Sequence, residues 1–320
     1  MRPLLILIAT LLAGVAHGQT SFPVKPVRFI VPQPAGGGYD TITRVIVARV
    51  QEYWGQTIVV DNRPGGNAII GTDLVAKAAP DGYTMMMGGI GPHGINPALF
   101  PKLPYDPVRD FTPIVYVGAA PNLLVVMPTL PVRTAQELAE LLKRPQARAM
   151  SYGSNGNGSS THLAAETFLH MIGAKAVHIP YKGSAPMVTA LLGNQVEVAF
   201  MNINDILVHV KAGTVRALAT AATQRAPLLP DVPTISEAGF PGAESLAWFG
   251  VFAPAGTPRE IVLKANADLN RAMKEPEVRT RLGHNGMELA GGTPEQFGEF
   301  VRAEIAKWTR VVREGNIRAD

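Results

Sequence analysis

The chain has 320 residues, of which 47% are hydrophobic and 17% charged, which suffices for a sizeable core and suggests two domains. Its formal net charge of +4 is dispersed along the chain, which argues against nucleic acid as a partner. It has no cysteine, which excludes disulfides, thiol catalysis and thiolate metal sites. Its seven histidines show no paired spacing, so we expect no metal and no cofactor.

The first eighteen residues have the pattern of an export signal. Arg2 supplies a positive charge, residues Leu4 to Val15 form an apolar core, and small residues follow up to Gly18. The core is shorter than the roughly 20 residues that a membrane span requires. We therefore expect cleavage near Gly18 and a soluble exported chain that begins near Gln19. The alternative is a buried N-terminal helix.

The next segments alternate between β-branched apolar runs and helical patterns. "VRFIVP" predicts a strand, "TITRVIVARVQEYWG" a helix that ends at Gly55, and "TIVVDNRPGG" a second strand with a turn. "GTDLVAKAAPDG" predicts a helix stopped by Pro80, and "YTMMMGG" a third strand. This alternation is typical of α/β folds that are built on parallel strands.

Two further segments predict a passage into a second unit. The proline-rich piece "GPHGINPALFPKLPYDPVRDFTPI" is expected to be irregular and to wrap the surface. The piece "IVYVGAAPNLLVVMP" is interpreted as two short apolar runs that cross into the second unit.

The second unit repeats the α/β pattern. A helix, "RTAQELAELLKR", and a strand, "RAMSYGS", precede a glycine-rich turn and a helix that ends at Gly173. "AVHIPYKGSAPMVTALLGNQ" predicts strand, turn and helix, with Ser184 as the N-cap and Pro186 in the first turn. "VEVAFMNINDILVHVKAG" predicts the same succession again.

The chain is then expected to cross back at "SLAWFGVFAPAG" and to end in helices, the last with Thr293 as N-cap and Gln296 completing a capping box. Two crossings predict an inserted domain: domain 1 comprises residues 19–120 and 245–320, and domain 2 comprises residues 121–244. The cleft between them should lie at the carboxyl ends of the strands. The hinges are expected at Ala119–Asn122 and Ser245–Trp248.

Three of the predicted strands are followed by glycine- or serine-rich turns that lead into a helix. They follow "VRFIVP", "MSYGS" and "VHIPYKG". A helix begins with unpaired N–H groups and the positive end of its dipole, and glycine lets an anion approach them closely. Hydroxyl donors are added by Ser154, Ser159, Ser160 and Thr161. The pattern predicts a carboxylate or phosphate site; simple turns are the alternative.

Asp40 stands in the first turn of the first predicted helix and is open to two interpretations. It can compensate the helix dipole. It can also orient the loop, or accept a hydrogen bond from a ligand hydroxyl, amine or ordered water. Its charge argues against direct contact with a ligand carboxylate.

Many segments, in the same order, resemble the periplasmic solute-binding proteins of the tripartite tricarboxylate transporter family, also called Bug proteins. They include "PAGGGYD", "DNRPGG", "AKAAPDGYT", "YGSNGNGSSTHLAAE", "YKGSAPM", "LPDVPTISEAGFPG" and "FAPAGTP". The resemblance covers nearly the whole mature chain. It implies a periplasmic Venus-flytrap protein of two α/β domains, each a mostly parallel sheet flanked by helices. Such a protein closes on a small carboxylate and passes it to a membrane permease. We expect a monomer.

The resemblance also implies a site in which backbone N–H groups and ordered waters hold a ligand carboxylate. Residues of the first glycine loop would face residues of the serine-rich loop across the cleft, namely Ala35, Gly36 and Gly37 opposite Ser154, Asn155, Gly158 and Ser159. Side chains expected to line the cleft are Tyr39, Asp40, His93, Asn202 and Trp248. His93 could instead brace its own loop, and Trp248 could be hinge packing.

Two positions depart from the family pattern. Ala190 stands where an acidic residue is usual in "TDLL", and Met201 replaces the acid of "FDN". Both changes remove negative charge. They suggest the hypothesis that the cleft is apolar at its distal side and that the far end of the ligand is aromatic or aliphatic.

Two other classes of function are alternatives to a transport receptor. An exported hydrolase would need a nucleophile motif, but there is no G-x-S-x-G, no P-loop lysine and no complete G-x-G-x-x-G. His162 lies three residues after Ser159, a spacing that is typical of a helix cap rather than a catalytic pair. We therefore expect no enzyme activity. A receptor that presents its ligand to a periplasmic sensor kinase would use the same fold.

Overall fold

The computed structural model describes residues 22–145, 149–284, 286–315 and 317. The predicted export signal lies outside these residues. Within the described part, no helix combines the length and the apolar character that crossing a membrane requires.

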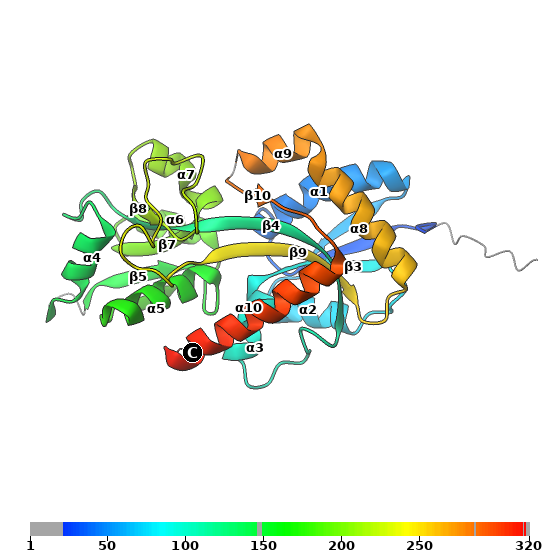
Figure 1. Ribbon diagram of the computed structural model, residues 1–320, viewed down its shortest axis with the longest axis horizontal. Helices are drawn as coiled ribbons and strands as arrows, with labels where there is room; N and C mark the ends of the chain where they lie inside the picture. The colour runs from blue at the N-terminus through cyan, green and yellow to red at the C-terminus, as the bar shows by residue number, and fades with distance from the viewer. Residues whose placement is uncertain (1–21, 146–148, 285, 316, 318–320) are drawn as a thin grey trace, which may run out of the picture.

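The strands fall into two sheets that share one long strand (Figure 1). Their bounds are β1 (Val27–Val31), β2 (Ile58–Asn62), β3 (Thr84–Gly89), β4 (Phe111–Val126), β5 (Ser151–Ser154), β6 (Val177–Pro180), β7 (Val198–Asn202), β8 (Arg216–Thr220), β9 (Leu246–Pro254) and β10 (Glu288–Leu289). The first sheet has the order β2-β1-β3-β9-β4, with β10 on β4. The second has the order β4-β7-β5-β6, with β8 on β4.

The helices cover both faces of each sheet. Their bounds are α1 (Gly38–Trp54), α2 (Ile69–Ala76), a π-helical turn (Gly91–Ile95), α3 (Asn96–Leu99), α4 (Ala135–Leu142), α5 (Ser160–Ile172), α6 (Ser184–Leu192), α7 (Ile203–Lys211), α8 (Arg259–Lys274), α9 (Pro276–Gly283) and α10 (Pro294–Glu314). We call β1–β3, β9, β10, α1–α3 and α8–α10 the first lobe, and α4–α7 with β5–β8 the second lobe.

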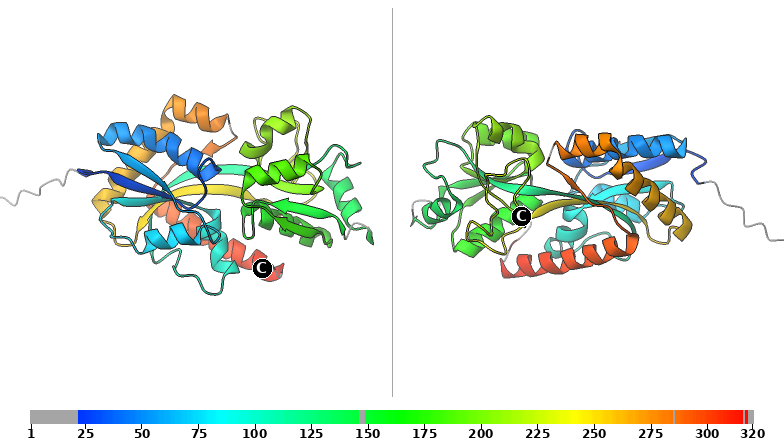
Figure 2. Two further views of the ribbon diagram at one scale, coloured as in Figure 1. Left: turned by 180° about the vertical axis from the view of Figure 1, so that it is seen from behind. Right: turned by 45° about the horizontal axis from the view of Figure 1, so that its top comes forward.

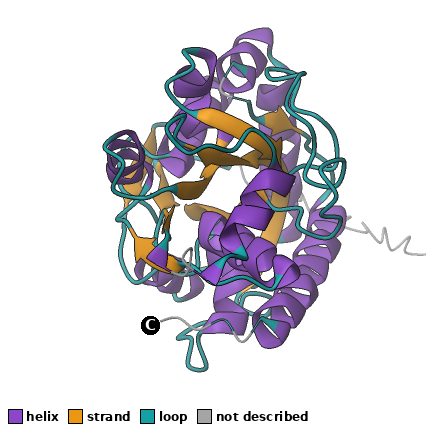
Figure 3. Ribbon diagram, turned by 90° about the vertical axis from the view of Figure 1, so that its left-hand side faces the viewer, coloured by secondary structure: helices purple, strands orange, loops and turns teal. Residues whose placement is uncertain are grey.

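Each lobe buries two hydrophobic clusters, one on either face of its sheet. In the first lobe, α1, α8 and α9 cover one face, and α2, α3 and α10 cover the other. In the second lobe, α4 and α5 lie on one face and α6 and α7 on the other. Seen from the end of the second lobe, the strands lie in the middle with helices around them (Figure 3). This is the α/β binding-protein architecture that the sequence predicts.

The two lobes are joined by β4, which changes partners along its length. Residues up to Pro121 pair with β9, whereas Asn122 to Val126 pair with β7 and β8. The described parallel pairings are β1–β2, β1–β3, β5–β6 and β5–β7, and each described antiparallel pairing includes β4 or β9. The parallel strands therefore lie in the outer part of each sheet, and their carboxyl ends carry the loops of interest.

Several local predictions are corrected. The two apolar runs expected at the crossing form the single strand β4, because its partner β9 pairs with it from Phe111 to Pro121. The pairing shifts register before Val115 and before Gly118. The segment expected to be irregular begins with the π-helical turn and α3. Ser184 is not an N-cap: Gly183 is, and the Ser184 hydroxyl donates to Asp205 instead.

Helix α10 runs along both lobes (Figure 2). Its capping box of Thr293 and Gln296 is confirmed. Further along, Trp308 shares a hydrophobic cluster with Leu163 of α5, and Lys307 Nζ donates to the carbonyl oxygen of Glu244 at 3.3 Å. The helix therefore packs against residues that belong to both sides of the crossing.

Candidate ligand-binding site

The first glycine loop connects β1 to α1. Ala35 and Gly36 are exposed, and Gly37 occupies the N-cap of α1 without any side-chain hydrogen bond to the helix. The first N–H groups of a helix have no partner inside it. Among the described residues, and apart from its two chain neighbours, no heavy atom lies within 4 Å of the place where a Cβ on Gly36 would stand. The backbone at the start of α1 is therefore unobstructed at Gly36, which suits the close approach of an anion.

Asp40 braces this loop from inside α1. One carboxylate oxygen accepts a hydrogen bond from the N–H of Gly36 at 2.9 Å, and Arg44 Nε donates to both oxygens at 2.9 and 3.0 Å. Burial alone would raise the pKa of Asp40, but the hydrogen bonds from Arg44 and Gly36 outweigh it and hold the pKa below its usual value. The Asp40 side chain, 4% exposed as a residue, thus matches the loop-orienting interpretation.

Tyr39 lies half-buried beside the same loop. Its ring packs edge-to-face against Phe249, with 4.9 Å between ring centroids, and its hydroxyl oxygen accepts a hydrogen bond from the N–H of Gly91. Burial raises the pKa of Tyr39. A Cβ on Gly89 would stand 2.3 Å from this hydroxyl, so glycine is needed there for the tyrosine to reach its position.

The serine-rich loop between β5 and α5 is braced by its own hydrogen bonds. The N–H of Asn155 donates to Thr161 Oγ1 at 2.9 Å, that of Gly158 to His162 Nδ1 at 3.1 Å, and that of Ser159 to the Gly156 carbonyl at 3.1 Å. Ser159 Oγ caps α5 by accepting from the N–H of His162. These three N–H groups therefore donate within the loop and not to a ligand.

Three stacked aromatic rings, those of His162, His178 and Tyr152, pack next to the serine-rich loop. His162 and His178 are stacked, with 4.1 Å between centroids, and Tyr152 stacks on His178 at 4.8 Å. His178 Nε2 shares a 2.7 Å hydrogen bond with Ser154 Oγ. Burial, together with neighbouring His178, lowers the pKa of His162 to about 3, so its Nδ1 stays an acceptor for Gly158. Ser154 is fully buried and connects the loop to His178 through this hydrogen bond.

The two lobes approach each other at these loops. A Cβ on Gly158 would stand 2.9 Å from Leu99 Cδ1 and 3.5 Å from Asn67 Nδ2. A Cβ on Gly38, at the start of α1, would stand 3.7 Å from Asn204 Nδ2 in the second lobe. The first glycine loop therefore faces the start of α7, and the serine-rich loop faces the loop that follows β2.

The loop after β2 was not predicted to belong to the site. Asn67 and Ala68 adopt φ angles of 54° and 71°, which are rare for residues other than glycine and follow two glycines with positive φ. The segment "RPGGNA" could have indicated this, because it is another glycine turn between a strand and a helix. Its place beside the serine-rich loop follows only from the fold.

Asp205 was not predicted to belong to the site either. Its carboxylate accepts hydrogen bonds from several polar side chains of the second lobe. Ser184 Oγ donates to it at 2.5 Å and Asn204 Nδ2 at 2.9 Å, and the Asn202 side chain also donates to it. Asn155 Nδ2 in turn donates to Ser184 Oγ at 3.2 Å. Burial raises the pKa of Asp205, an effect that the hydrogen bonds from Ser184 and Asn202 partly offset. Asn155 and Asn202 thus lie in one network.

His93 and Trp248 are not brought to these loops. His93 is fully buried and stacks on Phe252, with 3.9 Å between centroids and 4° between ring planes. Trp248 is 1% exposed, and its Nε1 donates to Glu304 Oε2 of α10 at 2.8 Å. Both side chains lie in the aromatic core of the first lobe.

The hypothesis of an apolar distal cleft loses its basis. Ala190 is 2% exposed and Met201 is 0% exposed, and Met201 packs in the core cluster between β7 and helices α6 and α7. Neither side chain reaches a cleft surface. Their replacement of acidic residues therefore concerns packing within the second lobe and says nothing of the ligand.

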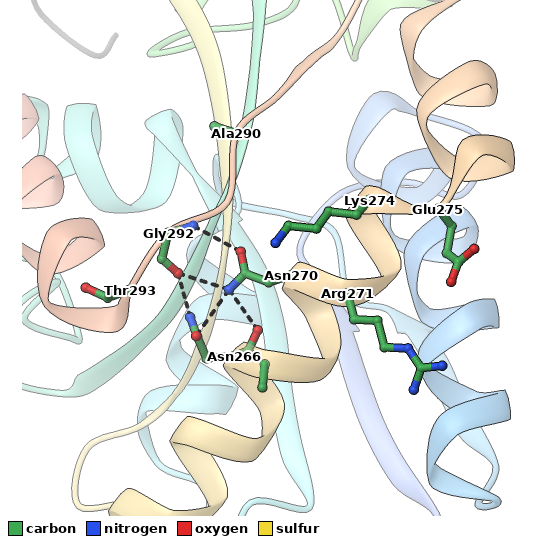
Figure 4. Close-up of a pocket in the computed structure, with 9 residues that line it drawn as sticks. Asn266, Asn270, Arg271, Lys274, Glu275, Ala290, Gly292 and Thr293 are labelled. Carbon is green, nitrogen blue, oxygen red and sulfur yellow. Dashed lines mark hydrogen bonds between the residues drawn. The ribbon is translucent and has the colours of Figure 1, made fainter.

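A separate hollow of about 740 Å³ lies between α8 and the segment before α10 (Figure 4). Its polar groups already bond one another: Asn270 Nδ2 and Asn266 Nδ2 donate to the Gly292 carbonyl at 3.0 and 2.8 Å, and Gly292 N–H donates to Asn270 Oδ1 at 3.0 Å. Through these hydrogen bonds, the two asparagines hold the segment around Gly292 against α8. Among the described residues, no group of three or more His, Asp or Glu side chains is placed to hold a metal ion.

Two α/β lobes joined by paired crossing strands, with loops at strand carboxyl ends facing each other, define a binding protein of the periplasmic type. The chain belongs to the tripartite tricarboxylate transporter family receptors, whose family model matches residues 42–317.

Individual relatives agree with this assignment. The chain is 37% identical to the protein BugT of Bordetella pertussis over 97% of this chain and 95% of that one. A Rhodopseudomonas palustris protein solved with adipate has a TM-score of 0.87 and 38% identity, covering 93% of this chain and 99% of that one. MatC of the same organism, solved with bound malate, has a TM-score of 0.84 and 36% identity, covering 91% and 100%.

Proposed function

We propose that this solute-binding protein captures a small carboxylate between its lobes and passes it to the membrane permease of a tripartite tricarboxylate transporter. The observation that best supports this proposal is the start of α1, which has no side-chain cap and faces the hydrogen-bond network around Asp205 in the second lobe. Similar proteins solved with adipate and malate support a carboxylate as the ligand. The chain acts as a monomer after cleavage of its export signal near Gly18.

The proposal includes two domains, residues 19–120 with 245–320 and residues 121–244, that close about the crossing segments. The change of strand partners between Pro121 and Asn122 supports this division. Hydrogen bonds from both lobes to one anion would favour the closed form, because only that form makes all of them. An exported hydrolase is disfavoured, because Ser154, which is bonded to His178, is fully buried.

The test is thermal unfolding of the refolded, ligand-stripped mature chain against mono-, di- and tricarboxylates. A ligand that binds only the folded protein adds about 2.7 kcal/mol of stability at one hundred times its dissociation constant. A raised midpoint with one carboxylate class is expected, and no shift with any carboxylate contradicts the proposal. Uptake of that carboxylate by cells lacking this gene separates transport from ligand presentation to a sensor, since only a transport receptor is needed for uptake.

A further inference from the structure

Helices α5 and α10 are both held to the crossing between the lobes, at two successive residues. Lys307 Nζ of α10 donates to the carbonyl oxygen of Glu244 at 3.3 Å. Ser245 Oγ donates to the carbonyl oxygen of Ser160, the first residue of α5, at 3.4 Å, and accepts from Asn122 Nδ2 of β4 at 3.0 Å. The start of α5 and the later part of α10 therefore lie beside the strands about which the lobes would turn.

A buried leucine joins the two helices at the same place. Leu163 lies in the first turn of α5 and is 0% exposed. It belongs to the hydrophobic cluster that includes Trp308 of α10 and Leu99 of α3, and it is the one described residue of the second lobe in that cluster. Separating the lobes at Leu163 would expose apolar surface to water, which is unfavourable. Leu163 is therefore a point at which the lobes stay in contact while they turn.

Beyond this contact, α5 and α10 enclose a groove of about 380 Å³. The two helices lie next to each other at the lower left of Figure 1. Glu166, Thr167, His170 and Met171 line the wall that belongs to α5. Residues from Arg310 to Ile317 line the other wall. The helices are thus in contact near the crossing and leave room between them a few residues later.

The opposite end of α5 leads to the ligand cleft. A Cβ on Gly158, just before α5, would stand 2.9 Å from Leu99 Cδ1 in the first lobe. From Leu163 to Met171, α5 extends about 12 Å toward the groove, at about 1.5 Å per residue. A rotation about the first turn of α5 that lifts Gly158 away from Leu99 therefore moves the far end of α5 toward α10.

We propose that α5 acts as a rigid lever, so that the groove narrows when the cleft opens and widens when the cleft closes. This inference rests on the lobe closure that is part of the proposed function. It makes the groove a place from which ligand affinity can be changed without any contact with the ligand. A side chain that keeps the groove wide favours the closed cleft, and apparent affinity rises with the fraction of closed molecules.

The first test fills the groove in the refolded, ligand-stripped mature chain. Thr167→Trp on α5 and Val311→Trp on α10 each place a large ring between the helices, from opposite walls. Spin labels on Ile70→Cys and Lys182→Cys, two exposed positions near the carboxyl ends of β2 and β6, measure the cleft distance in this cysteine-free chain. The fraction of molecules with a short cleft distance should rise at least about threefold in each variant. Equal cleft distances in the wild type and both variants would overturn the inference.

Thr189→Trp on α6 is the matched control. Thr167 and Thr189 each donate a hydroxyl hydrogen bond to the carbonyl oxygen four residues earlier, at 2.7 and 3.1 Å. Thr189 is exposed and does not line the groove, so its variant should keep the cleft distance of the wild type. A shift as large as that of Thr167→Trp would mean that the groove is not what matters, and the inference would fail.

The second test follows both distances while a ligand binds. The ligands are malate and adipate at saturating concentration, and a second labelled pair, His170→Cys with Glu314→Cys, spans the groove. Binding should shorten the cleft distance and lengthen the groove distance, and Thr167→Trp should bind the same ligand about three- to tenfold more tightly. A shorter cleft with an unchanged or narrower groove contradicts the lever and leaves ligand capture intact. If neither acid binds, capture of these carboxylates is contradicted, whereas the ligand-free test still decides the inference.

Discussion

The carboxylate of Asp40 accepts a hydrogen bond from the backbone N–H of Gly36, four residues earlier, at 2.9 Å. This bond shapes the glycine loop at the start of α1. Asp40→Ala should lower ligand affinity about tenfold and stability by about 1–2 kcal/mol, because a charge-assisted bond and the pairing with Arg44 are both lost. Calorimetry and urea unfolding measure the two effects.

The control is Asp73→Ala, which removes another ion pair at the same spacing, with Lys77 on α2. It should leave affinity unchanged. If Asp40→Ala bound ligand as the wild type does, the loop would not depend on this carboxylate.

Gly37 offers a direct test of anion approach. Its φ of −76° suits any residue, and an added Cβ would meet only the Pro34 carbonyl oxygen at 3.4 Å. Gly37→Val should therefore cost at most about 1 kcal/mol in folding but weaken ligand binding at least about tenfold, because its branched side chain covers the start of α1. Gly36 and Gly158 are poorer choices, since their φ angles of 80° and 70° strain any side chain.

For comparison, Gly91→Ala places a methyl group in open space. Binding should be normal in that variant. Normal binding by Gly37→Val would exclude the start of α1 as the anion site.

His93 should make stability depend on pH. Burial lowers its pKa from 6.5 to about 3, so the folded protein holds it neutral while the unfolded chain protonates it. Its contribution is complete above pH 6.5 and is lost as the pH falls toward 3, by about 1.4 kcal/mol per pH unit. His93→Phe keeps a ring against Phe252 and should remove about 2–3 kcal/mol of the loss between pH 6.5 and 4.5.

Urea unfolding across that pH range measures the effect. The pH profile of the wild type in His93→Phe would mean that His93 is not neutral in the folded protein.

The carboxylate of Glu304 accepts hydrogen bonds from the indole N–H groups of two tryptophans. Its Oε2 accepts from Trp248 Nε1 at 2.8 Å and from Trp308 Nε1 at 2.9 Å. Glu304→Leu would leave two buried indole N–H groups unpaired and should cost about 2–4 kcal/mol, whereas Glu304→Gln keeps an acceptor and should cost about 1 kcal/mol. Equal stability of the two variants in urea would show that the indole bonds contribute nothing measurable.

Local patterns in the sequence predict much of this fold. Alternating strand and helix patterns, the glycine loop before α1 and the capping box at Thr293 depend on neighbouring residues, so the chain itself carries the signal. The strand β4 was divided into two runs because Gly118 and Pro121 interrupt its pattern. Only the pairing with β9, which is remote in the sequence, makes it continuous.

The site was predicted less completely, because it too depends on contacts between residues that are remote in the sequence. The glycine loop and Asn155 belong to motifs, but Asp205 matters only because the fold brings Ser184, Asn202 and Asn204 to it. His93 and Trp248 stand in motifs too, yet both are buried among rings from distant segments. A motif indicates that a loop is needed and does not reveal which way each side chain points.

The shared strand β4 has a consequence for how the polypeptide acquires its structure. The strands of the second sheet all come from one uninterrupted stretch, from Asn122 to Thr220, and can assemble once that stretch is available. The first sheet lacks its central strand until β9 arrives, since Phe111 pairs with Pro254. A chain that is synthesised amino end first can therefore complete the second sheet before the first, and β1 to β3 keep an unpaired sheet edge until β9 is available.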